Sequence, residues 1–202
     1  MKSRYGKTVF KVIIIFSTSI CFFGANEVKM PGKQRILLDF EKPEESNNWF
    51  VINDVVMGGI SASSFQVTET GTAVFSGVLS LENNGGFASA NMKPSQFDAG
   101  DGDGIRFRFK GDGKKYKITL KNDDTFNGFS YRFAFSTKNG EWLTLDVPFA
   151  SFIPKFMGET TSAPPVDRKS IKTFGFLISD KQAGPFRLEI DWLGAYGKKE
   201  KP

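Results

Sequence analysis

Two short blocks with paired glycines hold the residues of this sequence best suited to contacting a ligand. Residues 53–61 place Asp54 ahead of a Gly-Gly pair, and residues 82–89 place Asn83 and Asn84 ahead of a second pair. Glycine would let the backbone approach a bound molecule closely, while the carboxylate and the amides would supply polar contacts. The same residue types also build tight turns and strand entries without any ligand. Neither block has the spacing of a phosphate-binding loop, so nucleotide chemistry is not expected.

The groups that most often carry catalysis are scarce in this sequence. It has no histidine, and Cys21 is its only cysteine. This excludes serine–histidine and cysteine–histidine catalysis and every metal site built on imidazole. A glycosidase needs two carboxyl groups across a sugar, but no spacing selects a pair among Asp54, Glu82, Asp112 and Glu189. We therefore predict a protein that is not an enzyme and uses no cofactor.

Acidic residues gather in three predicted loops, at Asp101 and Asp103, at Asp112, and at Asp123-Asp124. Calcium prefers such oxygen ligands, and a structural calcium would suit an exported protein. The spacing differs from that of an EF-hand loop, and Asp-Gly pairs commonly form hairpin turns. We predict turns and no metal site, with calcium as the alternative.

Aromatic side chains could offer a stacking surface for sugars. Trp192 continues the apolar alternation of the last predicted strand, and Tyr131 does the same in an earlier one, so both are predicted to lie in the core. Trp142 follows the turn signal Asn139-Gly140 and is the best candidate for an exposed ring. The predicted ligand-binding residues are therefore Asp54, Asn83, Asn84 and Trp142.

Strands must position these residues, because apolar and polar side chains alternate with a period of two from Arg35 onward. Such alternation is typical of strands with one face in a core and the other in water. Asn139-Gly140 is a strong hairpin signal, and residues 148–165 are predicted to be one long irregular segment. Many short strands without an amphipathic helix predict an all-β fold, either a β-sandwich or a jelly roll. The predicted strands cover residues 36–40, 64–67, 73–81, 87–92, 105–110, 116–121, 129–135, 142–147, 173–179 and 186–192.

The first 25 residues have the layout of a secretory signal peptide. Four basic residues precede an apolar run over 12–25 that is short for a membrane span, so an uncleaved anchor is the alternative. Without this leader 23 basic and 22 acidic residues remain, and binding to nucleic acid is not expected. We predict an exported, periplasmic protein with a single domain over 26–197 and a tail at 198–202.

Several ordered blocks of the sequence resemble the complex I intermediate-associated protein 30 family. They begin with residues 49–61, continue through 75–77, 82–89 and 111–116, and close with 184–190. The resemblance covers roughly residues 38–196, nearly all of the predicted mature chain.

This resemblance implies a galactose-binding-like β-sandwich. It also implies an assembly factor for NADH:ubiquinone oxidoreductase, which holds membrane-arm intermediates in a chaperone-like way without catalysing a reaction. The implied partner is a protein, in particular a membrane subunit of the respiratory chain, and the family offers no catalytic residues to carry over. The alternative function is an exported carbohydrate-binding module of the same fold, since the fold alone does not decide the ligand.

Overall fold

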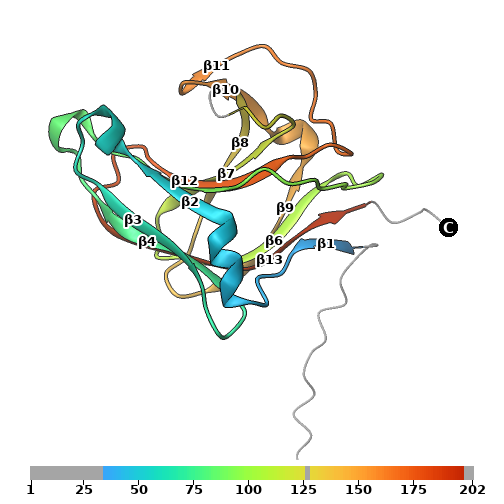
Figure 1. The fold of residues 1–202 in the computed structure, drawn as a ribbon, viewed down its shortest axis with the longest axis horizontal. Coiled ribbons are helices and arrows are strands. Elements are labelled where there is room, and N and C mark those ends of the chain that lie inside the picture. The colour runs from blue at the N-terminus through green and yellow to red at the C-terminus, as the bar shows by residue number, and fades with distance from the viewer. Residues whose placement is uncertain (1–33, 126–127, 198–202) are drawn as a thin grey trace, which may run out of the picture. The chain divides into compact units, whose positions relative to one another are not determined.

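The computed structural model describes residues 34–125 and 128–197, which form two antiparallel sheets (Figure 1). The predicted signal peptide, its anchor alternative and the predicted tail lie outside the described residues, and the bounds of a single domain stay a prediction. Within the described part, no helix is both long and apolar enough for a membrane span. The helical elements there are short 3-10 turns, η1 (Pro43–Asn48), η2 (Asp54–Met57), η3 (Glu82–Asn84) and η4 (Phe149–Ser151).

The first sheet is organised around its long C-terminal strand β13 (Gly184–Tyr196). One half of β13 pairs with β4 on one side, its other half pairs with β1 on that same side, and β6 lies along the opposite side. The order is β3–β4–β13–β6–β9, with β1 added beside β13. The other strands are β1 (Gln34–Leu38), β3 (Ala62–Val67), β4 (Ala73–Leu79), β6 (Gly104–Lys110) and β9 (Trp142–Pro148).

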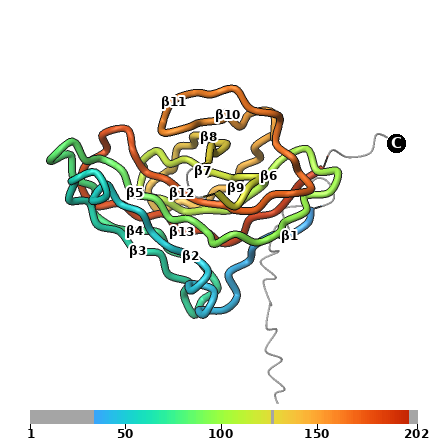
Figure 2. Tube along the Cα trace, turned by 45° about the horizontal axis from the view of Figure 1, so that its top comes forward, coloured from blue at the N-terminus to red at the C-terminus, as the bar shows by residue number. Residues whose placement is uncertain are grey.

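The second sheet has the order β11–β10–β8–β7–β12–β5–β2. The β10–β11 hairpin forms one edge of this sheet, next to β8 (Figure 2). The strands are β2 (Trp49–Asn53), β5 (Ala88–Met92), β7 (Lys115–Lys121), β8 (Ser130–Ser136), β10 (Ile153–Phe156), β11 (Glu159–Thr160) and β12 (Thr173–Ile178).

Phenylalanine side chains from both sheets meet in the core. The ring of Phe135 on β8 lies 5.1 Å from that of Phe107 and 4.8 Å from that of Phe109, both on β6 of the other sheet. These three residues are at most 5% exposed, and the alternate residues of each strand face outward. The structure therefore confirms the predicted all-β sandwich, and its core matches the period-two alternation of the sequence.

The Asn139-Gly140 turn does not close a hairpin, contrary to the sequence-based prediction. It connects β8 in the second sheet to β9 in the first, and the glycine adopts a φ of 73°. The turn lies beside the β6–β7 connection, which also crosses between the sheets, because Asn139 forms a bridge with Gly111 and the Gly140 N–H donates to the Gly111 carbonyl at 2.9 Å. A sandwich needs such crossings, and the local signal for positive φ does not distinguish them from hairpins.

Trp192 is not part of the core, contrary to the prediction. The pairing of β13 with β6 shifts register between Ile190 and Trp192, which is typical of a β-bulge. Past the bulge Leu193 is buried with 0% exposure, whereas Trp192 stays partly exposed. Tyr131 is buried as predicted, with 3% exposure.

Three strands were not predicted. β2 directly precedes the first glycine-rich block. β10 and β11 lie in the segment predicted to be irregular. β2 is a continuous apolar run from Trp49 to Ile52, so it shows no period-two alternation of apolar and polar residues. The two strands at the far edge have four and two residues, which is too short for a periodic signal.

Candidate functional site

The carboxylate of Asp54 joins the two glycine-rich blocks. This side chain is 1% exposed and lies at the start of η2, directly after β2. Its Oδ1 accepts the Ser61 N–H at 2.9 Å within the first block. Its Oδ2 accepts the Ser61 hydroxyl at 2.5 Å and, from the second block, the N–H groups of Gly86 at 2.6 Å and Phe87 at 3.3 Å. Two loops that are far apart in the sequence thus share one acceptor.

Two glycines leave the space that this carboxylate fills. A Cβ atom on Gly59 would lie 2.9 Å from the Asp54 Cβ, and one on Gly85 would lie 2.6 Å from Oδ2. Neither distance is compatible with a side chain at these positions. One glycine of each pair is therefore required by the close approach of Asp54, which explains why both blocks contain glycine.

Hydrogen bonding keeps Asp54 ionised. Burial raises the pKa of this carboxyl group, but the hydrogen bonds from the Ser61 hydroxyl and from the N–H groups of Gly86, Ser61 and Phe87 outweigh burial and hold the pKa below its usual value. A buried carboxylate with this many donors is satisfied within the protein. Its contacts account for the residue as an organiser of the two loops.

Asn83 and Asn84 lie in η3, next to these loops, and both side chains are exposed. Their φ angles are 54° and 59°, a left-handed conformation that asparagine tolerates better than most residues. Figure 1 shows η2 and η3 side by side at one end of the sandwich, in agreement with the Asp54 contacts. The structure thus brings three of the four predicted ligand-binding residues to one end of the fold.

Trp142 lies elsewhere, on the outer face of the first sheet. It pairs with Lys110 on β6, and three strand-to-strand steps, at least about 14 Å, separate β9 from β4. The guanidinium of Arg108 lies 4.5 Å from the ring centroid and the Lys110 ammonium lies 5.1 Å from it. These two cations lie over the ring. Because of the separation across the sheet, the structure does not group Trp142 with Asp54, Asn83 and Asn84.

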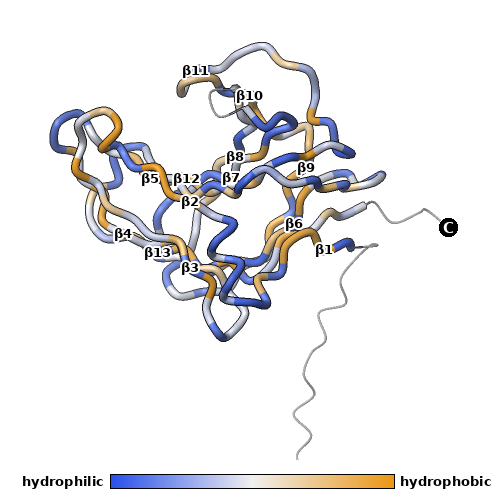
Figure 3. The backbone as a smooth tube through the Cα atoms, viewed as in Figure 1, coloured by the Kyte–Doolittle hydropathy of each residue, from blue (hydrophilic) through white to orange (hydrophobic). Residues whose placement is uncertain are grey.

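An apolar surface surrounds the Asp54 loops, and the sequence analysis did not find it. We call it the apolar corner; its side chains are between 42% and 73% exposed. Its members lie in η2, in the segment before β3, near the end of β4 and directly before η3 (Figure 3). The residues are Val55, Val56, Met57, Ile60, Val78 and Leu81.

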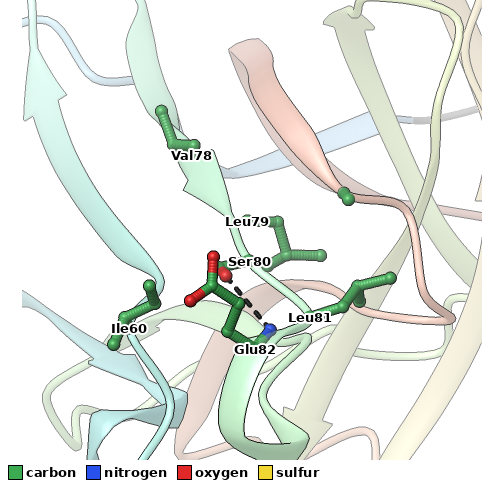
Figure 4. A pocket seen from close by; sticks show the side chains of 7 residues that line it. Ile60, Val78, Leu79, Ser80, Leu81 and Glu82 are labelled. Atoms are coloured by element: carbon green, nitrogen blue, oxygen red, sulfur yellow. Dashed lines mark hydrogen bonds between the residues drawn. The ribbon is translucent and has the colours of Figure 1, made fainter.

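An open pocket of about 630 Å³ lies within the apolar corner. Ile60, Val78 and Leu81 line it, together with Glu82 (Figure 4) and Ala183. The Glu82 N–H donates to the Ser80 hydroxyl at 3.2 Å, which fixes the turn beneath the pocket. Sequence patterns could not reveal this surface, because a short apolar run such as Val55-Val56-Met57 is equally compatible with burial.

The acidic loops do not form a metal site within residues 34–125 and 128–197. Among these described residues, no three His, Cys, Asp or Glu side chains lie close enough together to hold a metal ion. Asp112 instead accepts the Tyr116 hydroxyl at 3.0 Å and the Arg187 N–H at 2.9 Å. Asp123 accepts the hydroxyl of Thr125 at 2.7 Å.

A family model for complex I intermediate-associated protein 30 matches residues 38–190. The chain belongs to this family. It is 26% identical over 184 residues to complex I intermediate-associated protein 30 of Mus musculus, a match that covers 80% of this chain and 56% of the mouse protein. The Drosophila melanogaster relative is 25% identical over 189 residues, covering 81% of this chain and 63% of the relative. The chain thus spans little more than half the length of the curated relatives it matches.

Solved structures with a similar fold include carbohydrate-binding modules and agarase chains. A family 11 module of the Clostridium thermocellum cellulase Lic26A-Cel5E has a TM-score of 0.63 at 16% identity, covering 86% of this chain and all of that chain. The family 11 module in complex with a β-1,3-1,4-mixed-linked tetrasaccharide has a TM-score of 0.61 at 19% identity, covering 85% of this chain and 99% of the module. At such identities the likeness shows the fold alone, and it confirms the galactose-binding-like sandwich.

The predicted location is corrected by the family relatives. Both the mouse and the fly proteins are named as mitochondrial. These names point to mitochondria, so the prediction of an exported, periplasmic protein was wrong. The prediction misread an N-terminal stretch of basic and apolar residues, a composition that several kinds of targeting segment share in part.

Proposed function

We propose that this chain is a non-catalytic assembly factor for respiratory complex I and that the apolar corner binds its protein partner. Membership of the complex I intermediate-associated protein 30 family supports the assembly role. The observation that carries the binding site is the cluster of exposed apolar side chains at the end of the sandwich. Contiguous exposed apolar surface is typical of interaction sites, since it costs free energy to keep in water.

The corner is suited to binding because its backbone is held from within. Asp54 ties η2 to Ser61 and to the loop before β5, so the loops that carry Val56 and Leu81 are fixed before a partner arrives. A preorganised surface loses less conformational entropy on association than a disordered one. We infer that the partner presents an apolar segment of a complex I membrane subunit, which matches the corner in chemistry.

Paired variants test this function. Val56→Ser with Met57→Ser removes the two most exposed side chains of η2, whereas Met157→Ser removes a side chain that is 83% exposed at the β10–β11 turn. Each full-length, tagged variant would be expressed in its native cells and captured from detergent-solubilised membranes. We expect the wild type and Met157→Ser to retain membrane-arm subunits of complex I and the double variant to lose them. Equal capture by the double variant, or no complex I subunit with any variant, would refute the proposal.

Carbohydrate binding is the second candidate function. The fold likeness to family 11 modules favours it, as do the exposed amides of Asn83 and Asn84. Binding on a glycan array would test it, with Asn84→Ala and Trp142→Ala as variants. A glycan that binds both variants as well as the wild type would reject these residues as the sugar site.

A further inference from the structure

The outer face of the second sheet carries a row of residues that lies outside the two glycine-rich blocks. Strand register places one residue from each of six neighbouring strands in line across this face. Directly paired residues on neighbouring strands share a face, about 4.8 Å apart. The row from β2 to β10 is Phe50, Asn91, Gly175, Thr119, Arg132 and Ile153.

This sheet is strongly unbalanced in charge. Its seven strands contain five basic residues, and their only acidic residue is Glu159 in the two-residue edge strand β11. The first sheet differs, because its outward-facing Lys110 pairs with Glu189 at 3.0 Å and Arg108 pairs with Asp191, both acids being on the adjoining strand β13. The basic residues of the second sheet are Lys115, Lys117, Lys121, Arg132 and Lys155.

Arg132 lies at the centre of this imbalance. It is partly buried, its Nε donates to the Ser130 hydroxyl at 2.9 Å, and no carboxylate of the described residues lies within ion-pair distance. Burial accordingly lowers the pKa of the guanidinium. Lys117 and Lys121 each have a loop carboxylate nearby, at 2.7 Å and 3.7 Å, which Arg132 lacks. Removing a cation from water without a counter-charge costs free energy that an anionic ligand would return.

The groups beside Arg132 can complete an anion site. Thr119 is its direct neighbour on β7, and the hydroxyl of Thr119 has no hydrogen-bond partner among the described residues. Gly175 comes next and adds no side chain of its own; a Cβ there would lie 2.7 Å from the Thr119 Oγ1 and 3.1 Å from the Asn91 Oδ1. Lys155 faces outward diagonally from Arg132 and donates to the Thr160 hydroxyl at 2.7 Å.

We propose that this face is a second docking surface, which binds an acidic segment of a partner polypeptide. A partner Asp or Glu carboxylate would accept a bidentate pair from Arg132 and a further hydrogen bond from Thr119, with Lys155 adding long-range attraction. Ile153, 51% exposed and paired with Arg132, offers an apolar contact of the kind that polypeptide side chains make. The surface lies on strands that the apolar corner does not use, so the inference does not depend on the function proposed for that corner.

A direct binding measurement tests the proposal on the full chain. The probe is a fluorescent peptide of alternating glutamate and leucine, and its counterpart replaces every glutamate with glutamine. We expect Arg132→Gln to weaken binding of the glutamate peptide about tenfold and Lys155→Gln to weaken it less. Lys138→Gln removes the same charge from an exposed surface turn and should leave affinity within about twofold.

Further arms make the outcome unambiguous. Arg132→Lys keeps the charge but not the bidentate geometry and should give intermediate affinity. Arg132→Gln should not lower the free energy of unfolding, because it removes a partly buried cation that donates to a neutral hydroxyl and has no counter-charge among the described residues, and this separates lost binding from lost folding. Equal affinity for the glutamate and glutamine peptides, unchanged affinity in Arg132→Gln, or binding of oligogalacturonate or an oligonucleotide in place of the glutamate peptide would overturn the proposal.

Discussion

Asp54 shows how one buried charge can organise two loops. Its carboxylate accepts hydrogen bonds from the buried N–H of Ser61 and the partly buried N–H groups of Gly86 and Phe87, so its removal would leave all three without this acceptor. Hydrogen bonds to charged groups are stronger than those between neutral groups, and an unsatisfied buried donor adds its own desolvation cost. The residue is therefore better described as the anchor of the apolar corner than as a surface group.

We expect Asp54→Asn to lower the free energy of unfolding by about 2–4 kcal/mol. An amide keeps the shape but offers one oxygen and adds two N–H donors to a site made of donors. Urea denaturation would measure the loss, and amide exchange at Gly86 and Phe87 should become faster. Unchanged stability would contradict the role assigned to the carboxylate.

The same carboxylate makes stability depend on pH in one direction. Because the folded-state pKa of Asp54 lies below its usual value, its contribution is fully present above the unfolded pKa, about 3.9, and is lost as the pH falls through the folded pKa. The stability gap between wild type and Asp54→Asn should therefore be constant from about pH 7 to pH 5 and should narrow below about pH 4. If the stability difference between wild type and Asp54→Asn widened on acidification, the lowered pKa assigned to Asp54 would be wrong. Urea titrations at matched ionic strength would measure it.

At the scale of the elements, the packing of the Gly85 loop against Asp54 at the start of η2 depends on a close approach that only glycine permits. Gly85→Ala should destabilise the fold by about 1–3 kcal/mol, because the new Cβ would lie 2.6 Å from the Asp54 Oδ2. Gly197→Ala is the matched control, since nothing lies within 4 Å of a Cβ there. Thermal unfolding of the two variants should separate them by several degrees. Equal midpoints would mean that the loops relax around the added methyl group.

The bulge in β13 decides which side chain fills the core. Leu193→Ala should cost about 2–5 kcal/mol, as is usual for a buried leucine. Trp192→Ala should cost less, even though tryptophan is the larger side chain, because Trp192 stays partly exposed. Chemical denaturation of both variants would rank them, and the reverse order would place the bulge elsewhere.

At the scale of the whole molecule, stability and binding should be separable. The side chains of Val56 and Met57 are each 73% exposed, so replacing both with serine should change the free energy of unfolding by no more than about 0.5 kcal/mol each. A large loss of stability would show that these residues serve the fold, and lost partner capture could then not be assigned to binding. Denaturation curves of the double variant and of Met157→Ser supply that comparison.

Much of the architecture was predictable because burial on one face of a strand leaves a direct mark on the sequence. Ten predicted strands correspond to observed ones, with ends that differ by a few residues. The prediction for Trp192 was wrong because a bulge changes the face on which each following residue lies. The prediction for Asn139-Gly140 was wrong because a turn signal does not indicate which strands the turn connects. The pairing partners of β8 and β9 depend on contacts that are distant along the chain.

The sequence by itself determined the all-β class, the alternation that builds the core and the family to which the chain belongs. Only the tertiary structure showed that both glycine-rich blocks enclose one carboxylate, that Trp142 lies under two cations and that no carboxylate of the described residues forms an ion pair with Arg132. The physical reason is that periodicity records which face of a strand is buried. Hydrogen bonds, charge pairing and exposed apolar surface arise between segments that meet only after the two sheets have packed together.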